Sequence, residues 1–411
     1  MIKKPESARQ LVSLQYLRAV AALLVVFLHA TIQVNNLRAP NTSAWLEVGK
    51  CGVDIFFVLS GFVMWASTAG RSGVLEFLRR RLVRIVPLYW IVTLAAAGVA
   101  LVAPQLLNST RFDLHHVLAS LFFIPWRNPV VPFEPGADLT EVLKPLITPG
   151  WTLNFEMFFY AQFALALLVP QRLRVAALVL IITGVYVVFS SVSATADVFT
   201  FYGSTLVFEF LAGSVLAAGI GAARAPASGA GTGALPVAVP VAVLLAAFAV
   251  LILDDAWFTD KVRAAALGIP AVVLVGAAVA VERAGRLPFL RLLDELGNAS
   301  YSIYITHIFS VAGMRIVPRA LGLDPLVLGR PFFIVACVVL AASVGLAVHL
   351  FLEKPLIRRL NRGRLPVSMT IAAQSGAVRP GLGAELRPVP SSDLAAADPS
   401  TSVPSPQSRS S

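Results

Sequence analysis

Residues 17–30 read LRAVAALLVVFLHA, an apolar stretch with Arg18 near one end and His29 near the other. Side chains of this kind cost free energy in hydrocarbon, so a membrane helix keeps them where they have a partner or a function. A helix turns 100° per residue, which places the two side chains about 20° apart on one face and about 16 Å apart along the axis. The stretch therefore predicts a membrane helix with one polar face, with Arg18 near the cytoplasmic boundary and His29 beyond the midplane.

The remainder of the chain has the composition of a membrane protein. Of its 411 residues, 57% are hydrophobic and 13% are charged, and the mean hydropathy is +0.79. Apolar stretches of about 20 residues recur, which is the length that crosses a bilayer. We predict an all-α, polytopic integral membrane helical bundle of about ten transmembrane helices. The predicted spans are roughly 14–32, 51–69, 85–103, 151–170, 175–192, 200–220, 235–253, 264–281, 300–317 and 331–352.

The distribution of basic residues predicts the orientation of the chain. Most of the 33 lysines and arginines fall in the segments that share a side with the N-terminus. Positively charged loops stay in the cytoplasm, so both termini are expected there. The net charge of +11 then reflects arginines that flank membrane helices beside anionic lipids, and we expect no nucleic-acid partner.

Composition also divides the chain into segments. We expect a cytoplasmic N-terminal segment, a transmembrane domain and a disordered cytoplasmic tail rich in Ser, Pro and Ala. Their boundaries are 1–13, 14–365 and 366–411. The only cysteines, Cys51 and Cys337, show neither a disulfide framework nor metal-binding spacing, so no metal site is expected.

Two acidic residues are predicted to lie inside the membrane, in the second and fourth spans. Asp54 opens the second span from the external side, so its carboxylate is expected at about the depth of His29. It either orients the imidazole or interacts favourably with the dipole at its own helix N-terminus. In the fourth span, Glu156 and Tyr160 lie one helical turn apart, with Trp151 at the external interface. An acid at this depth needs a partner.

Further polar residues lie on the cytoplasmic side or within other spans. Arg81 and Arg84 belong to the segment RRRLVRIVP and are neighbours on a helix. They indicate either a site for phosphate groups or ordinary positive-inside topology. The ninth span contains Tyr301 and His307, and Glu209 lies in the sixth. These three suit interhelical hydrogen bonds as well as a functional role.

Six segments together resemble the membrane-bound acyltransferase family 3, whose members O-acylate cell-surface glycans. They are LRAVAALLVVFLHA, GVDIFFVLSGFVM, RRRLVRIVP, WTLNFEMFFY, SYSIYITHI and FLEKPL. The resemblance spans about residues 11–360 and is closest to the exopolysaccharide and succinoglycan acetyltransferase branch. The chain departs from many relatives by having no second acid directly after Glu156.

The resemblance implies an enzyme in the bacterial cytoplasmic (inner) membrane. Its co-substrate would be acyl-CoA, with acetyl-CoA as the expected donor and no bound cofactor, and its acceptor would be a hydroxyl of a polysaccharide or a lipid-linked glycan. By the family's pattern, His29 is the key catalytic residue, Arg81 and Arg84 bind the donor, and Arg18 supports the same channel. Polysaccharide biosynthesis or export proteins are expected partners.

Two mechanisms and two other functions stay open at this point. His29 acts as a general base on the acceptor hydroxyl, or it carries the acyl group covalently. Asp54 or Glu156 would orient His29, while Tyr160 or Trp151 would contribute to the oxyanion site. The alternatives to an enzyme are a proton-coupled transporter and a non-catalytic assembly factor for polysaccharide export. The sequence shows no internal repeat of the kind common in transporters.

Overall fold

A computed structural model describes residues 11–37, 49–68, 73–107, 110–131, 142–192, 197–222, 238–254 and 263–362. Within these ranges all regular secondary structure is helical and no strand occurs, which confirms the predicted all-α class. The predicted tail, 366–411, and most of the predicted N-terminal segment, 1–13, lie outside the described residues, so both segment boundaries stay predictions.

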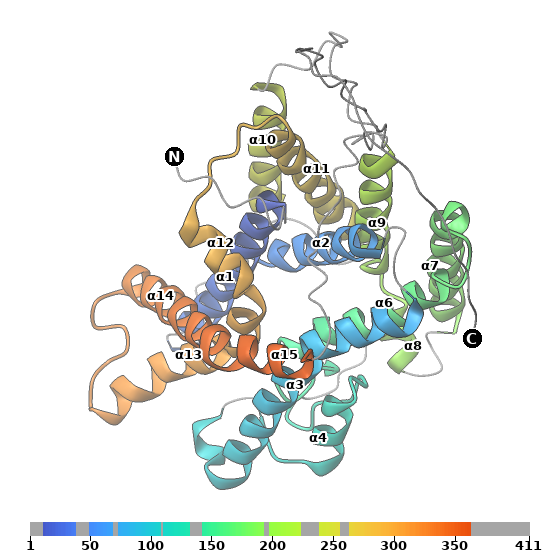
Figure 1. The fold of residues 1–411 in the computed structure, drawn as a ribbon. Coiled ribbons are helices and arrows are strands. Elements are labelled where there is room, and N and C mark those ends of the chain that lie inside the picture. Colours follow the sequence, from blue (N-terminus) through green and yellow to red (C-terminus); the bar gives the residue numbers. More distant parts are fainter. Residues whose placement is uncertain are drawn as a thin grey trace, which may run out of the picture. The chain divides into compact units, whose positions relative to one another are not determined.

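The helices follow the predicted spans in order along the chain (Figure 1). The long and intermediate helices are α1 (Val12–Leu37), α2 (Cys51–Thr68), α3 (Val74–Val102), α6 (Gly150–Ala166), α7 (Arg174–Ser191), α9 (Val207–Ala222), α10 (Ala238–Asp254), α11 (Ile269–Arg283), α13 (Ser300–Ala320) and α14 (Arg330–Val348). Short helices are α4 (Leu114–Leu121), α8 (Asp197–Tyr202), α12 (Arg291–Asn298) and α15 (Lys354–Leu360), with 3₁₀ turns at Pro104–Leu106 and Gln171–Leu173 and π-turns η5 (Ala264–Gly268) and η6 (His349–Glu353).

Seven helical stretches in the described residues are long and apolar enough to cross a membrane. They begin at Val12, Cys51, Val74, Gln171, Asp197, Ala264 and Arg330. The other three predicted spans also form helices, but α6 and α10 have only 17 residues each, and α13 begins with a polar sequence. The protein is therefore a multi-pass membrane protein.

Helix α1 contacts α2, α11, α12, α13 and α14 (Figure 1). Its N-terminus is capped from a distant helix, because the Glu282 carboxylate accepts hydrogen bonds from the backbone N–H groups of Val12, at 2.8 Å, and Ser13, at 2.9 Å. A carboxylate in this position satisfies free N–H groups and complements the helix dipole. This contact fixes the end of α1 that carries Arg18.

Helices α2 and α9 cross at two glycines. A Cβ atom added to Gly61 would lie 2.0 Å from the Phe210 carbonyl oxygen, and one added to Gly213 would lie 2.0 Å from the Val58 carbonyl oxygen. Small residues of this kind let membrane helices approach closely, because packing replaces the hydrophobic driving force that lipid does not supply. The Ser214 hydroxyl also donates a hydrogen bond to the Gly61 carbonyl at 3.1 Å.

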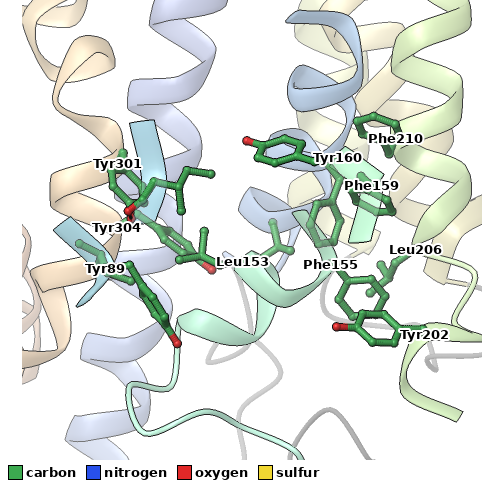
Figure 2. Close-up of a cluster of buried hydrophobic side chains, with 14 of the residues drawn as sticks. Tyr89, Leu153, Phe155, Phe159, Tyr160, Tyr202, Leu206, Phe210, Tyr301 and Tyr304 are labelled. Atoms are coloured by element: carbon green, nitrogen blue, oxygen red, sulfur yellow. Dashed lines mark hydrogen bonds between the residues drawn. The ribbon is translucent and has the colours of Figure 1, made fainter. Parts of the chain in front are cut away.

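Aromatic side chains of α6 fill the space between α2 and α8–α9 (Figure 2). The Phe159 and Phe210 rings stack with centroids 4.4 Å apart, and Phe155 stacks on Phe201 at 4.6 Å. Each stacked pair of this kind adds about 0.5–1.5 kcal/mol to the area it buries. The packing sets the rotation of α6 about its axis and hence the direction in which Glu156 points.

We expect Gly213→Ala to reduce the amount of folded protein, because its new methyl group overlaps the α2 backbone. The matched control is Gly219→Ala on the same helix, where an added Cβ has no heavy atom of the described residues within 4 Å. Alanine in an exposed helical position is about 1 kcal/mol better than glycine, so the control is expected to fold at least as well as the wild type. Monodisperse protein recovered in detergent measures both variants. Equal recovery of the two would contradict the close crossing.

Candidate active site

The imidazoles of His29 on α1 and His307 on α13 lie beside each other. Their ring centroids are 4.8 Å apart with an edge-to-face angle of 67°. His29 is half-buried and His307 is fully buried. Two residues far apart in the sequence therefore form one histidine pair, which sequence reasoning did not predict, although it selected both residues.

Backbone hydrogen bonds set the tautomer of both rings. The Nδ1 atom of His29 lies 2.9 Å from the Val25 carbonyl oxygen, and the Nδ1 atom of His307 lies 2.7 Å from the Tyr304 carbonyl oxygen. A carbonyl only accepts, so each Nδ1 carries the proton and, in a neutral ring, Nε2 carries the lone pair. Nε2 is thus the basic nitrogen of His29, and the buried Nε2 of His307 has no hydrogen-bond partner in the described part of the chain.

Helix α1 is uninterrupted from Val12 to Leu37. The predicted common face of Arg18 and His29 requires this continuity, since a kink between them would rotate one away from the other. Arg18 lies within electrostatic range of Arg84, Glu156, Glu353 and Arg81. The end of the polar face that carries Arg18 therefore points to a cluster of charged side chains, and the end that carries His29 contacts His307.

Glu156 connects α6 to α2 within this cluster. Its Oε1 atom accepts hydrogen bonds from the hydroxyl groups of Tyr160, at 2.6 Å, and Ser60, at 2.9 Å. The i,i+4 arrangement of Glu156 and Tyr160 follows the helical spacing expected from the sequence. Ser60 was not selected from the sequence, because a serine in an apolar helix gives no signal of its partner.

Arg81 on α3 faces the same group of residues. Its Nη2 atom donates to the Ser67 hydroxyl at 2.8 Å, and its guanidinium lies 5.8 Å from the Phe77 ring centroid and 5.9 Å from that of Tyr160. Cation–π contacts of this kind stabilise an arginine where water is scarce. Arg81 also lies within electrostatic range of Glu156, so the acid and the arginine belong to one site.

Arg84, one turn further along α3, has a different acidic partner. Its Nη1 atom lies 3.2 Å from Glu353 Oε1. Glu353 is 1% exposed, and its Oε2 atom accepts hydrogen bonds from Ser302 Oγ, at 2.6 Å, and His349 Nδ1, at 2.7 Å. Sequence reasoning quoted FLEKPL but did not select Glu353, the acid within it, although an acid at the end of a long apolar stretch was the signal for a functional or paired residue.

Three arginines and two carboxylates thus converge from four parts of the fold. Arg18 comes from α1, Arg81 and Arg84 from α3, Glu156 from α6 and Glu353 from η6. Three cations and two anions leave one formal positive charge. The arrangement keeps the arginines together in a low-dielectric setting and still favours an anionic ligand.

Asp54 has a partner that the sequence did not suggest. Arg263, just before η5, binds it with both Nε and Nη2, at 3.1 Å to Oδ1 and 2.9 Å to Oδ2. Glu209 lies within electrostatic range of both residues. This second cluster joins α2, α9 and η5, and its arginine is already bound by both oxygens of Asp54, so it does not suit an anionic ligand. A role for Asp54 beside His29 stays a prediction.

Two aromatic residues that were candidates from the sequence, Tyr301 and Trp151, contact helices next to the site. The Tyr301 hydroxyl donates to the Ile85 carbonyl oxygen at 2.7 Å, next to Arg84. Trp151 packs edge-to-face against Phe57, with centroids 6.3 Å apart, at the start of α6. Both contacts connect a helix of the site to its neighbour.

The segment before α6 is fixed by a histidine outside the predicted spans. His116 on α4 is buried, and its Nε2 atom donates to the Lys144 carbonyl oxygen at 2.9 Å. Burial lowers the pKa of His116, against the opposing effects of that hydrogen bond and of Asp113. The ring is therefore neutral at pH 7 and supports the loop that leads into Gly150 and Trp151.

Comparison with known proteins supplies the family. The chain is 35% identical over 332 residues to the exopolysaccharide production protein ExoZ of Rhizobium meliloti, a match that covers 78% of this chain and 93% of the relative. It is 28% identical over 393 residues to the acyltransferase MdmB of Streptomyces mycarofaciens, covering 88% and 95%. A shorter match, 28% over 177 residues, links it to the O-acetyltransferase OatA of Staphylococcus aureus, covering 40% and 26%.

No solved structure matches the chain. Residues 11–350 match the acyltransferase domain family, and this range contains His29, His307 and the three arginines of the charged cluster. The chain therefore belongs to the membrane-bound acyltransferase family 3.

Proposed function

We propose that the protein O-acylates an exported or cell-surface polysaccharide, or its lipid-linked precursor, with an acyl group from cytoplasmic acyl-CoA, most simply acetyl-CoA. The convergence of Arg18, Arg81 and Arg84 with one excess positive charge is the observation that carries the donor assignment. CoA bears several phosphate groups, which guanidinium groups bind in bidentate fashion. The name of the ExoZ relative, which refers to exopolysaccharide production, supports the acceptor assignment.

The proposed reaction also depends on how the chain crosses the membrane. Ten spans with both termini in the cytoplasm of a bacterium would place the arginine cluster at the inner side of the cytoplasmic membrane, where CoA is present. His29 then lies deeper along the same face of α1, about 16 Å from Arg18 by helical rise. An extended donor would reach from the arginines to the histidine pair, and the acceptor hydroxyl would enter from the external side.

In the proposed reaction, His29 Nε2 removes the proton from the acceptor hydroxyl, and the oxygen attacks the thioester carbonyl carbon. The new C–O bond forms as the C–S bond breaks, and the imidazolium returns the proton to the leaving thiolate. In the covalent variant, Nε2 itself attacks the thioester carbonyl carbon, and the C–S bond breaks to release the CoA thiolate. The acceptor oxygen then attacks the acyl-imidazolium, the C–N bond breaks, and the hydroxyl proton passes to the thiolate. His307 packs against the His29 ring and supports its orientation in both variants.

Surrounding residues receive supporting roles. Glu156 neutralises the arginines and helps to orient the catalytic region, and Tyr160 fixes Glu156 through its hydroxyl. Trp151 and Tyr301 hold α6 and α13 in place. The bidentate contact with Arg263 gives Asp54 an indirect role, in which it fixes the start of α2 rather than touching the imidazole. Polysaccharide biosynthesis or export proteins are proposed partners.

We expect His29→Ala to abolish acylation while the level of protein in the membrane is maintained. Loss of a general base lowers the rate by about 10²–10⁴-fold. His115→Ala, which removes an exposed histidine on α4, is the matched control and should leave acylation intact. Mass spectrometry of glycan from deletion cells that express each variant measures the result. Full acylation with His29→Ala would exclude the proposed role.

The same glycan measurement separates the enzyme from the other two functions. Deletion of an acyltransferase removes the acyl mass and leaves the polymer. Loss of the whole polymer on deletion would instead indicate an export or assembly function.

Replacing both Arg81 and Arg84 by lysine tests the donor site. Lysine preserves the charge that directs insertion, but it lacks the guanidinium fork. Each lost charge-assisted hydrogen bond costs about 1.5–3 kcal/mol, so we expect the KM for acyl-CoA to rise tenfold or more. Acyl transfer in inverted membrane vesicles measures it. The matched control replaces Arg79 and Arg80 by lysine on the same helix. An equal KM for acyl-CoA in both double variants would indicate that Arg81 and Arg84 only direct membrane topology.

Asp54→Asn distinguishes the two roles of that residue. If Asp54 only neutralises Arg263, the substitution leaves a poorly paired buried charge and lowers the yield of folded protein. Activity per folded molecule should then fall less than tenfold, against the larger loss expected when a catalytic orienting group is removed. Yield by size-exclusion chromatography and activity of the purified fraction give the two values. Normal yield with strongly reduced activity would place Asp54 in the catalytic machinery.

A further inference from the structure

Glu353 occupies an unusual place in the last long helix of the described residues. It ends the π-turn η6 (His349–Glu353), which joins α14 to α15. π-turns are rare, and they frequently occur at functional sites because the extra residue redirects side chains. Here the turn directs both His349 and Glu353 inward, since both are buried.

The two oxygens of Glu353 have different environments. Oε2 accepts from Ser302 and from His349, so the carboxylate is fixed by two helices. Oε1 lies 3.2 Å from Arg84 Nη1, yet among the described residues it has no hydrogen-bond partner of suitable geometry. The acid therefore holds the guanidinium by charge, without using an N–H group in an aligned hydrogen bond.

Arg84 keeps an accessible surface in this arrangement. Its side chain is 33% exposed, whereas that of Glu353 is 1% exposed. The neighbouring backbone is also fixed, because Tyr301 donates to the Ile85 carbonyl oxygen. A buried, immobile acid thus sets the place of a partly exposed arginine whose donors remain suited to a second anion.

We propose that Glu353 is a positioning residue for Arg84 in binding the phosphate groups of acyl-CoA, and that Ser302 and His349 hold Glu353 for this task. The inference rests on the proposed function, because it assigns the donor to the arginine cluster. Preorganisation is the physical reason: an arginine held in its bound conformation loses less conformational freedom when the ligand arrives.

A positioning role and a simple charge effect of Glu353 predict opposite changes in CoA affinity. Removing an acid beside an anion site raises the positive potential there, which by itself tightens binding of an anionic ligand. Loss of a positioning group weakens binding instead. A purely structural tie between α3, α13 and η6 would lower the yield of folded protein without any specific dependence on Arg84.

A double-mutant cycle on the full-length protein tests the proposal. The variants are Glu353→Gln, Arg84→Gln and the two combined, each purified in detergent and assayed for direct binding of CoA and for the KM and kcat of acyl transfer. We expect Glu353→Gln to weaken CoA binding by about tenfold, as for a misplaced charge-assisted hydrogen bond, with kcat little changed. The double variant should bind like Arg84→Gln alone, because the acid acts through the arginine.

Two further variants distinguish a specific effect on CoA binding from a loss of folding. Ser302→Ala removes one hydrogen bond to Glu353 and leaves both charges, so we expect CoA binding to weaken about threefold, and only when Arg84 is present. Glu295→Gln makes the same change of charge in the exposed Arg291–Glu295 pair and should leave CoA binding unchanged.

The positioning role of Glu353 and the donor site can be contradicted separately. If the wild type binds CoA but the effects of Glu353→Gln and Arg84→Gln multiply, or if Glu353→Gln binds CoA more tightly, the positioning role is overturned and the donor site stands. If the purified wild type binds no CoA, the donor assignment is overturned, and this inference with it.

Discussion

Neutralisation of charge within the membrane domain is the constraint on which the candidate site depends. Arg18, Arg81 and Arg84 would repel one another in a low-dielectric setting without the carboxylates of Glu156 and Glu353. Because these five side chains come from α1, α3, α6 and η6, the cluster also specifies how those helices are arranged. The charges that prepare the site for an anion thus help to hold it together.

Close helix packing supplies the rigidity that such a cluster needs. Gly61 and Gly213 bring the α2 and α9 backbones together, and the stacked aromatic rings of α6 fit against α9 (Figure 2). Glu156 and Ser60, which are hydrogen-bonded across α6 and α2, inherit their relative positions from this packing. A site held within a fraction of an ångström by its supporting residues is a general requirement for catalysis.

Two clusters of charged side chains within the described residues differ in composition. The arginine cluster has three cations for two acids, whereas the second has Asp54 and Glu209 around Arg263. An excess of arginine favours phosphate or carboxylate ligands, whereas the guanidinium of Arg263 is already bound by both oxygens of Asp54. The excess of arginine over acid thus distinguishes a region suited to an anionic donor from one that joins α2, α9 and η5.

The sequence by itself determined the helical class, the membrane setting, the family and most residues of the candidate site. Hydrophobic stretches and intramembrane charges are local signals, and they selected Arg18, His29, Glu156 and His307 because each is costly in hydrocarbon. Only the tertiary structure decided the partners. The pairing of His29 with His307, Arg84 with Glu353 and Asp54 with Arg263 joins residues from helices distant in the sequence. Helical periodicity gives the face on which a side chain lies, but the packing of helices decides what that face meets.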